Sequence, residues 1–304
     1  MIRVLVTGAR GQVGAEVARL LRGRADVIGH DRSTLDLARP DAIVERVREA
    51  RPRLIVNAGA YTAVDRAEAE ADAARAVNAR APEVLAEEAL RAGALLVHYS
   101  TDYVFDGTKA GPYVESDAPA PVNAYGATKL EGERAVSASG CAHVILRTSW
   151  VYGPRGRNFM RTMLEAAKTR PELRVVDDQR GAPTTSLALA RATLALIGAD
   201  AGTAAITEGG IEAAASRSGL YHATAGGETT WFAFAKAIFE EWSARAGPAF
   251  KPPVVIPIPT RDYPTPARRP ANSVLSNERL ARELGVRLGP WREGLAEAIS
   301  LFDA

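Results

Sequence analysis

A tyrosine and a lysine stand four residues apart in the segment Tyr125-Gly-Ala-Thr-Lys129. Residues at this spacing share one face of a helix, so we expect the two side chains to be neighbours. A nearby ammonium favours the phenolate and lowers the pKa of a phenol, and such a phenol exchanges protons near neutral pH. The chain has eight tyrosines and five lysines, and no other tyrosine has a lysine four residues on. The pair predicts acid–base chemistry at Tyr125.

Two hydroxyl side chains, Ser100 and Thr101, follow an apolar run at residues 95–98. The run predicts a buried strand, and open α/β sheets bind their ligands at the carboxyl ends of the strands. We therefore expect Thr101 to hydrogen-bond the reacting oxygen, with Ser100 as the alternative for that role. Together with Tyr125 and Lys129, Thr101 completes a predicted Ser/Thr–Tyr–Lys triad.

A glycine-rich loop at residues 7–14 (TGARGQVG) follows a predicted strand and opens a predicted helix. Its glycines, Gly8, Gly11 and Gly14, allow the backbone to approach a pyrophosphate closely. The N-terminus of the helix adds free N–H donors and the positive end of a dipole. The spacing differs from the commoner Gly-x-Gly-x-x-Gly, but its position between strand and helix predicts a dinucleotide-binding site.

Asp31 and Arg32 stand at the end of the second predicted strand, about 20 residues beyond the glycine loop. An acid at this place binds the 2′-hydroxyl of an adenosine ribose, whereas an arginine accommodates a 2′-phosphate. The two residues favour different cofactors, so the sequence leaves both NADH and NADPH open.

Apolar runs typical of buried strands alternate with segments of helical periodicity through the first half of the chain. Strands are predicted near residues 2–7, 27–28, 54–56, 95–98 and 144–147, and helices near 13–22, 41–47, 67–92, 124–137 and 159–168. A break is expected in the third helix near Pro82. This alternation predicts an α/β fold with a doubly wound parallel sheet of the Rossmann type.

Glycine and proline become frequent after about residue 150, and the predicted strands become short. We therefore expect a dinucleotide-binding domain at residues 1–150. Residues 151–304 would form mainly a smaller substrate-binding lobe, with some segments returning to the first domain. Residues 199–218 are rich in glycine and alanine, and we interpret them as a surface insertion.

The 304 residues are 47% hydrophobic and 24% charged, with a formal net charge of +2. This composition is typical of a globular protein, and the small basic surplus gives no reason to expect nucleic acid as a partner. The single cysteine, Cys141, excludes a disulfide framework and a cysteine-based zinc site. The chain has no apolar run of about 18 residues, so no membrane association is expected, and we predict a cytoplasmic protein.

Five segments in order along the chain extend this interpretation to a family. They are residues 57–68 (NAGAYTAVDRAE), 97–107 (VHYSTDYVFDG), 147–153 (RTSWVYG), 178–184 (DQRGAPT) and 268–273 (RRPANS). In these segments the chain resembles the dTDP-4-dehydrorhamnose reductases, a family of extended short-chain dehydrogenases/reductases. The family reduces the C4 ketone of dTDP-4-dehydro-L-rhamnose to dTDP-L-rhamnose with NADPH or NADH, so the resemblance implies a sugar nucleotide as substrate.

The resemblance also implies roles for single residues. Tyr125 would donate the proton, Lys129 would hold the nicotinamide ribose and tune Tyr125, and Thr101 would orient the sugar carbonyl. Tyr103 and Trp150 match positions that contact the sugar nucleotide, as apolar sugar faces favour. The positions that would bind the cofactor are Gly8, Gly11, Gln12, Val13, Gly14, Asp31, Arg32, Ala58, Gly59, Ala60, Tyr125 and Lys129.

Two alternatives remain open on the sequence. A sugar-nucleotide dehydratase or epimerase of the same superfamily is one, although dehydratases carry Asp-Glu after the active-site threonine and this chain has Asp102-Tyr103. A regulatory subunit that binds NADP(H) without turnover, resembling the methionine adenosyltransferase β subunit, is the other.

Some relatives dimerise around magnesium that glutamates from both subunits hold. Glu16 matches one such ligand and Glu297 a third, but Leu187 stands where the second carries a carboxylate. Magnesium needs several oxygen ligands, and leucine supplies none. We therefore expect no metal, and either a monomer or a dimer that no metal bridges.

Overall fold

Six parallel strands form the central sheet of the computed structural model, which describes residues 1–199 and 205–302. Their order is β10-β5-β4-β3-β1-β2, and every neighbouring pair is parallel. The strands are β1 (Arg3–Thr7), β2 (Asp26–His30), β3 (Leu54–Asn57), β4 (Leu95–Thr101), β5 (His143–Thr148) and β10 (Gly219–His222). The predicted doubly wound α/β fold is confirmed.

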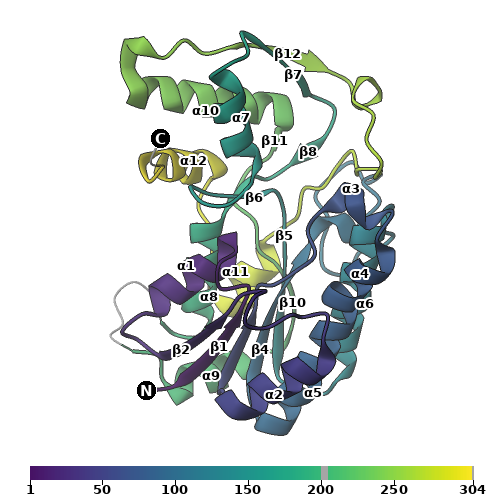
Figure 1. The fold of residues 1–304 in the computed structure, drawn as a ribbon, viewed down its shortest axis with the longest axis vertical. Helices are drawn as coiled ribbons and strands as arrows, with labels where there is room; N and C mark the ends of the chain where they lie inside the picture. Colours follow the sequence, from purple (N-terminus) through teal and green to yellow (C-terminus); the bar gives the residue numbers. More distant parts are fainter. Residues whose placement is uncertain (200–204, 303–304) are drawn as a thin grey trace.

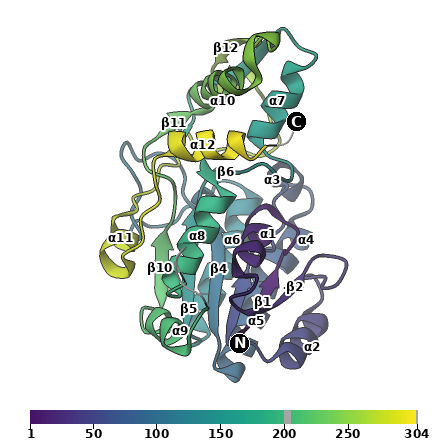
Figure 2. The ribbon, with the colours of Figure 1, turned by 90° about the vertical axis from the view of Figure 1, so that its left-hand side faces the viewer.

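Helices cover both faces of the sheet because successive strand residues point to opposite sides (Figures 1 and 2). In β1, Val4 and Val6 join one core with α1 (Gln12–Leu21), α8 (Ser186–Leu196) and α9 (Glu208–Ala215). Leu5, between them, joins the other core with α2 (Pro40–Ala50), α5 (Ala81–Ala92) and α6 (Ala124–Ala138). Within the two described ranges, none of the helices is long and apolar enough to span a bilayer.

The helix expected at residues 67–92 is divided in the structure. It consists of α3 (Val64–Ala67), α4 (Ala71–Arg75), a π-helical turn at Ala76–Arg80, and α5. Pro82 is the second residue of α5, and the chain is helical without a gap from α4 through the π-helical turn into α5. The irregularity lies in the turn before the proline, because proline has no N–H to donate and its ring crowds the carbonyl four residues back.

A second hydrophobic core, rich in aromatic side chains, belongs to the helices drawn above the sheet in Figure 1. It is built by α7 (Phe159–Ala167), α10 (Trp231–Ala246) and α12 (Trp291–Ser300), with the parallel pair β7 (Glu172–Val176) and β12 (Val254–Ile258). Short pairs connect it to the sheet: β6 (Val151–Tyr152) with β9 (Thr184–Thr185), and β8 (Arg180–Gly181) with β11 (Thr229–Thr230). The domain boundary at residue 150 stays a prediction.

The expected surface insertion at residues 199–218 is wrong for most of its length. Residues 200–204 lie outside the described part of the chain, but α9 follows them and buries Ile211 and Ala214 in the core of the sheet. Ile206 is also buried there. Glycine and alanine let α9 approach the sheet closely, so few large apolar residues are needed to bury it. The scarcity of large apolar residues weakens the helical periodicity of the sequence here.

A buried ion pair joins α6 to the middle of the sheet. Arg147 on β5 donates to both carboxylate oxygens of Glu133, at 2.9 and 2.6 Å, and each side chain is only 3% exposed. The Ser100 hydroxyl on β4 donates to the same carboxylate at 2.5 Å. The guanidinium also lies 5.0 Å from the Phe105 ring centroid. These contacts fix the position of α6, the helix that carries Tyr125 and Lys129.

We predict that Arg147→Met destabilises the protein by about 3–5 kcal/mol, because it leaves the Glu133 carboxylate buried without its cation. The free energy of unfolding, measured by urea denaturation, tests this. Arg75→Met is the matched control, since Arg75 pairs with Glu131 of the same helix at 2.8 Å on an exposed surface. Its cost should be below about 1 kcal/mol. Equal costs for the two variants would contradict the prediction.

Candidate active site

The glycine loop lies where the strand order reverses, between β1 and β3, which is the place where open α/β sheets bind ligands. Gly8 has a φ of +64°, and a Cβ there would lie 2.7 Å from the backbone N of Gly59. A Cβ on Gly14 would lie 2.2 Å from the carbonyl oxygen of Gly8. The loop can therefore adopt this conformation beside Ala58 and Gly59 only because Gly8 and Gly14 lack side chains.

The first turn of α1 presents free backbone N–H groups beside this loop. Its N-cap is Gly11, whose own N–H donates to the Gly8 carbonyl at 2.7 Å. The Gln12 side chain reaches across to Asn158, whose amide donates to it at 3.0 Å. Val13 packs against the core of the sheet, which leaves only its backbone for a ligand. These features suit a pyrophosphate, since helix N-termini bind anions.

An arginine that the sequence interpretation missed lies beside the predicted ribose-binding residues. The Arg10 Nε atom lies 2.9 Å from Asp31 Oδ2. The pKa of Asp31 is below its ordinary value because the hydroxyl and backbone N–H of Ser33, at 2.6 and 2.8 Å, hydrogen-bond its carboxylate. Arg32 is exposed. Arg10, which belongs to the glycine loop, thus partly neutralises the charge of Asp31.

Thr101 and Tyr125 meet at the carboxyl end of β4. Burial raises the pKa of the Tyr125 phenol to about 12; the neighbouring Thr101 hydroxyl opposes this shift and the Asp102 charge adds to it. The sequence interpretation predicted a lowered pKa from Lys129. That direction is wrong in the structure because the Lys129 ammonium is directed elsewhere.

Lys129 is 2% exposed and lies beneath the strand end. Its Nζ donates to the Tyr99 carbonyl at 2.6 Å and lies 3.4 Å from His98 Nε2. Burial lowers the pKa of Lys129 to about 8, and the Glu133 carboxylate opposes this shift. The ammonium therefore stays charged at neutral pH and close to the carboxyl ends of the strands.

A chain of buried hydrogen bonds connects this lysine to the glycine loop. The Thr7 hydroxyl donates to Asn57 Oδ1 at 2.7 Å and accepts the N–H of Gly59 at 3.2 Å. Asn57 Nδ2 lies 2.9 Å from His98 Nδ1. Burial keeps the pKa of His98 well below its ordinary value. The predicted cofactor and catalytic residues thus share one rigid polar layer across β1, β3 and β4.

The alternation of side chains along β4 separates Ser100 from Thr101. The Ser100 hydroxyl donates to Glu133 beneath α6, whereas Thr101 lies at the strand end beside Tyr125. Of the two alternatives for the oxygen-binding hydroxyl, the geometry favours Thr101.

A carboxyl group that the sequence interpretation assigned no role lies next to Thr101. Asp102, in the 3-10 turn Asp102–Val104, is 3% exposed, and its Oδ1 accepts the Thr101 hydroxyl at 2.9 Å. Its Oδ2 has no hydrogen-bond partner within residues 1–199 and 205–302. Burial raises the pKa of Asp102 to about 7. The sequence shows that Asp102 directly follows Thr101, but it does not show that the Asp102 carboxyl group is buried.

The two aromatic residues expected at the substrate lie in different surroundings. The Tyr103 ring stands edge-on to the Tyr125 ring, with centroids 5.8 Å apart. Trp150 has a φ of +47° and stacks on Trp231 of α10 at 3.5 Å between centroids. A Cβ on Gly181 would collide with the Trp150 ring at 2.4 Å. Backbone strain of this kind occurs preferentially at functional sites. Trp231, which the sequence interpretation did not select, thus forms part of the same aromatic surface.

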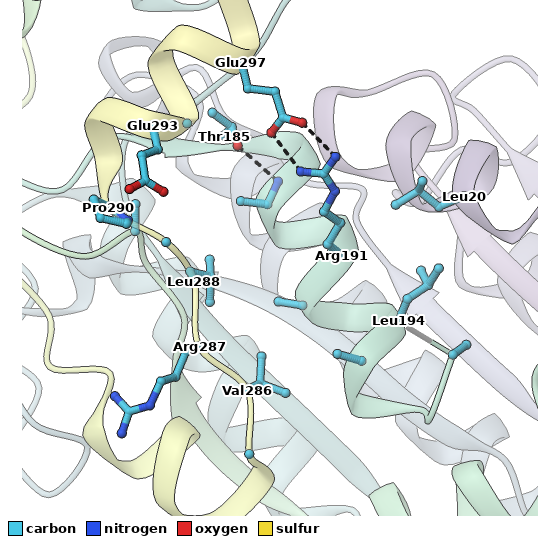
Figure 3. Close-up of a pocket in the computed structure, with 18 of the residues that line it drawn as sticks. Leu20, Thr185, Arg191, Leu194, Val286, Arg287, Leu288, Pro290, Glu293 and Glu297 are labelled. Atoms are coloured by element: carbon cyan, nitrogen blue, oxygen red, sulfur yellow. Dashed lines mark hydrogen bonds and ion pairs between the residues drawn. The ribbon is translucent and has the colours of Figure 1, made fainter. Parts of the chain in front are cut away.

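A cavity of about 560 Å³ lies apart from these residues, between α8, α12 and the segment 285–290 (Figure 3). At its edge Arg191 binds Glu297 through two contacts of 2.8 and 2.7 Å. Glu16 is 5% exposed and paired with Arg19 at 2.8 Å, and Leu187 is buried. In the described part of the chain, no three His, Cys, Asp or Glu side chains gather as a metal site requires.

Comparisons with known proteins identify the family of this chain. The family model described as the RmlD substrate binding domain matches residues 2–303. The dTDP-4-dehydrorhamnose reductase of Burkholderia thailandensis is 50% identical over 96% of both chains. A structure of the reductase from Clostridium acetobutylicum has a TM-score of 0.88 at 38% identity, covering 99% of both chains. The reductase of Bacillus anthracis, solved in complex with NADP, has a TM-score of 0.87 at 34% identity, covering 99% of this chain and 100% of that one. The chain therefore belongs to the dTDP-4-dehydrorhamnose reductase family of NAD(P)H-dependent reductases.

Proposed function

We propose that this protein reduces the C4 ketone of dTDP-4-dehydro-L-rhamnose to give dTDP-L-rhamnose, with NADPH or NADH as reductant. One observation carries the proposal: Thr101 and Tyr125 lie side by side at the carboxyl end of β4, close to the buried ammonium of Lys129, and the glycine loop follows the carboxyl end of β1 in the same sheet. The names of the relatives support this substrate.

The residues around the glycine loop fit a dinucleotide. Gly8, Gly11 and Gly14, with the backbone N–H groups of Gln12 and Val13, would hold the pyrophosphate, because Cβ atoms are absent where the backbone must approach. Ala58, Gly59 and Ala60 would line the path between β1 and β3. Asp31 and Arg32 would bind the adenosine ribose, and Lys129 the nicotinamide ribose. The bound cofactor supplies the hydride.

Tyr125 is suited to donate the proton that the reduction requires. A ketone that accepts hydride gains negative charge on its oxygen, and a placed acid stabilises this charge. Since the pKa of Tyr125 is about 12, the phenol carries its proton at neutral pH. Thr101 would orient the same oxygen by donating a hydrogen bond to it.

Tyr103 and Trp150 would bind the sugar nucleotide. Both rings are partly exposed, and Trp150 is held by its stack on Trp231. An aromatic face suits the apolar C–H face of a deoxyhexose. The Tyr103 ring stands 5.8 Å from the Tyr125 ring between centroids, which supports a sugar site beside the proposed proton donor.

We also propose that no magnesium ion bridges subunits. Glu16 and Glu297, which match ligand positions of relatives, are each paired with an arginine, and Leu187 offers no oxygen. A cation would have to replace both arginines. The chain would then be a monomer, or a dimer formed without metal.

The decisive experiment generates the keto sugar enzymatically in the cuvette and follows the loss of NADPH or NADH absorbance. Oxidation that depends on both the sugar and this protein supports the proposal, and the product is identified by chromatography. NADPH binding without any oxidation would instead favour the regulatory-subunit alternative.

Tyr125→Phe should lower kcat by ~10²–10⁴-fold, because it removes the proton donor. Affinity for NADPH should stay nearly unchanged. Tyr263→Phe makes the same chemical change at a 58% exposed tyrosine and should retain wild-type turnover. Near-normal turnover in Tyr125→Phe would show that another group supplies the proton.

Affinity for NADPH should fall as pH rises through about 8, because the Lys129 ammonium is charged below its pKa of about 8 and neutral above it. Lys129→Met should weaken binding at pH 7 and abolish this pH dependence. Fluorescence titration of NADPH measures both effects. Lys168→Met, at an exposed lysine paired with Glu165, should behave as wild type. A pH dependence that persists in Lys129→Met would exclude Lys129 as its source.

Asp31→Ala should shift the cofactor preference toward NADPH, and Arg32→Ala toward NADH. A hydrogen bond to a charged group contributes about 1.5–3 kcal/mol, so each ratio of kcat/KM values should change by about tenfold or more. Arg10 already pairs with the Asp31 carboxylate, so Asp31→Ala changes the cofactor preference less if Arg10 alone neutralises that carboxylate. Unchanged ratios in both variants would show that neither residue contacts the ribose.

A further inference from the structure

The Thr101 hydroxyl has one proton and more than one acceptor. Its oxygen accepts the N–H of Tyr103 at 3.2 Å, and its proton is donated to Asp102 Oδ1 at 2.9 Å. The Tyr125 phenol lies beside the same hydroxyl. Because a hydroxyl donates only once, a proton held by Asp102 is withheld from Tyr125 and from a substrate oxygen.

The surroundings of Asp102 favour the neutral form of its carboxyl group. The groups that face it are the hydroxyls of Thr101 on β4 and Ser273 in the segment before α11 (Glu278–Leu284), and the phenols of Tyr125 and Tyr103. No cation is paired with Asp102 in the part of the chain that the structure describes, and its Oδ2 has no hydrogen-bond partner there. Burial without a counter-charge disfavours the carboxylate, and the pKa of Asp102 is accordingly raised to about 7.

We propose that Asp102 is a positioning residue that sets the direction in which Thr101 donates its proton, an inference that rests on the proposed reduction. A neutral Asp102 donates its own proton to the Thr101 oxygen, and Thr101 then donates to the ketone oxygen. An ionised Asp102 accepts the Thr101 proton instead. Only the neutral form prepares the site for reduction.

The proton balance of the reduction is unaffected by this role. Hydride adds to C4, the C=O π electrons move to oxygen, and Tyr125 protonates that oxygen. Asp102 keeps its proton throughout, because it only determines which way the Thr101 hydroxyl points. Its effect is therefore on the orientation of a hydrogen bond, and the group that transfers the proton stays Tyr125.

Asp102→Asn tests the proposal, because an amide N–H₂ donates to Thr101 at every pH. In the wild type, kcat/KM should fall about tenfold per pH unit above a midpoint near the Asp102 pKa of about 7. In Asp102→Asn the decline should start about one unit higher, where Lys129 loses its charge at about 8. Asp106→Asn, the same change at a partly exposed carboxylate in the next turn, should reproduce the wild-type profile.

Thermal stability supplies a readout without substrate. The Asp102 pKa is raised from 3.8 to about 7, so the folded wild type holds a proton in this interval that the unfolded chain releases. Wild-type Tm should therefore decrease relative to Asp102→Asn as pH rises from about 4 to 7. A constant Tm difference would overturn the proposal, and so would superimposable kcat/KM profiles. If the wild type reduces no keto sugar, the proposed function fails, and the Tm comparison still decides whether Asp102 titrates as inferred.

Discussion

The arrangement of the site depends on the buried ion pair between Glu133 and Arg147. Helix α6 carries Tyr125, Lys129 and Glu133 at successive intervals of four residues, so all three point toward the sheet. The guanidinium on β5 holds the last of them at 2.6 Å, and the Ser100 hydroxyl on β4 contacts the same carboxylate. One anchor at the far end of this helical face thus determines where the phenol and the ammonium lie against β4.

Burial gives these groups their proton affinities. Lys129 loses basicity in the interior, Tyr125 retains its proton, and Asp102 becomes a weak acid, all because charge is poorly solvated there. The same closed layer is hydrogen-bonded to the glycine loop through Asn57 and Thr7. The residues proposed for proton transfer and those proposed for cofactor binding therefore share a common set of strand ends.

Local patterns in the sequence were sufficient to predict the strands, the glycine loop and the helix that carries Tyr125 and Lys129, since each depends on neighbours within a few residues. The pairing of Arg10 with Asp31, and of Arg147 with Glu133, was missed because partners far apart in the chain meet only after folding. The pKa of Tyr125 was predicted in the wrong direction for a related reason. The Tyr99 carbonyl draws the Lys129 ammonium to itself, and no spacing rule shows this. The glycine- and alanine-rich helix α9 was not predicted, because few large side chains pack it against the core of the sheet.

The stack of Trp150 on Trp231 gives the protein a built-in optical reporter. One indole follows β5 of the sheet and the other begins α10 of the upper core, and the rings are nearly parallel at 7°. Two indoles in such contact couple their electronic transitions, and this coupling falls steeply with separation. The circular dichroism of the pair is therefore sensitive to a relative movement of the sheet and the upper core, without any added label.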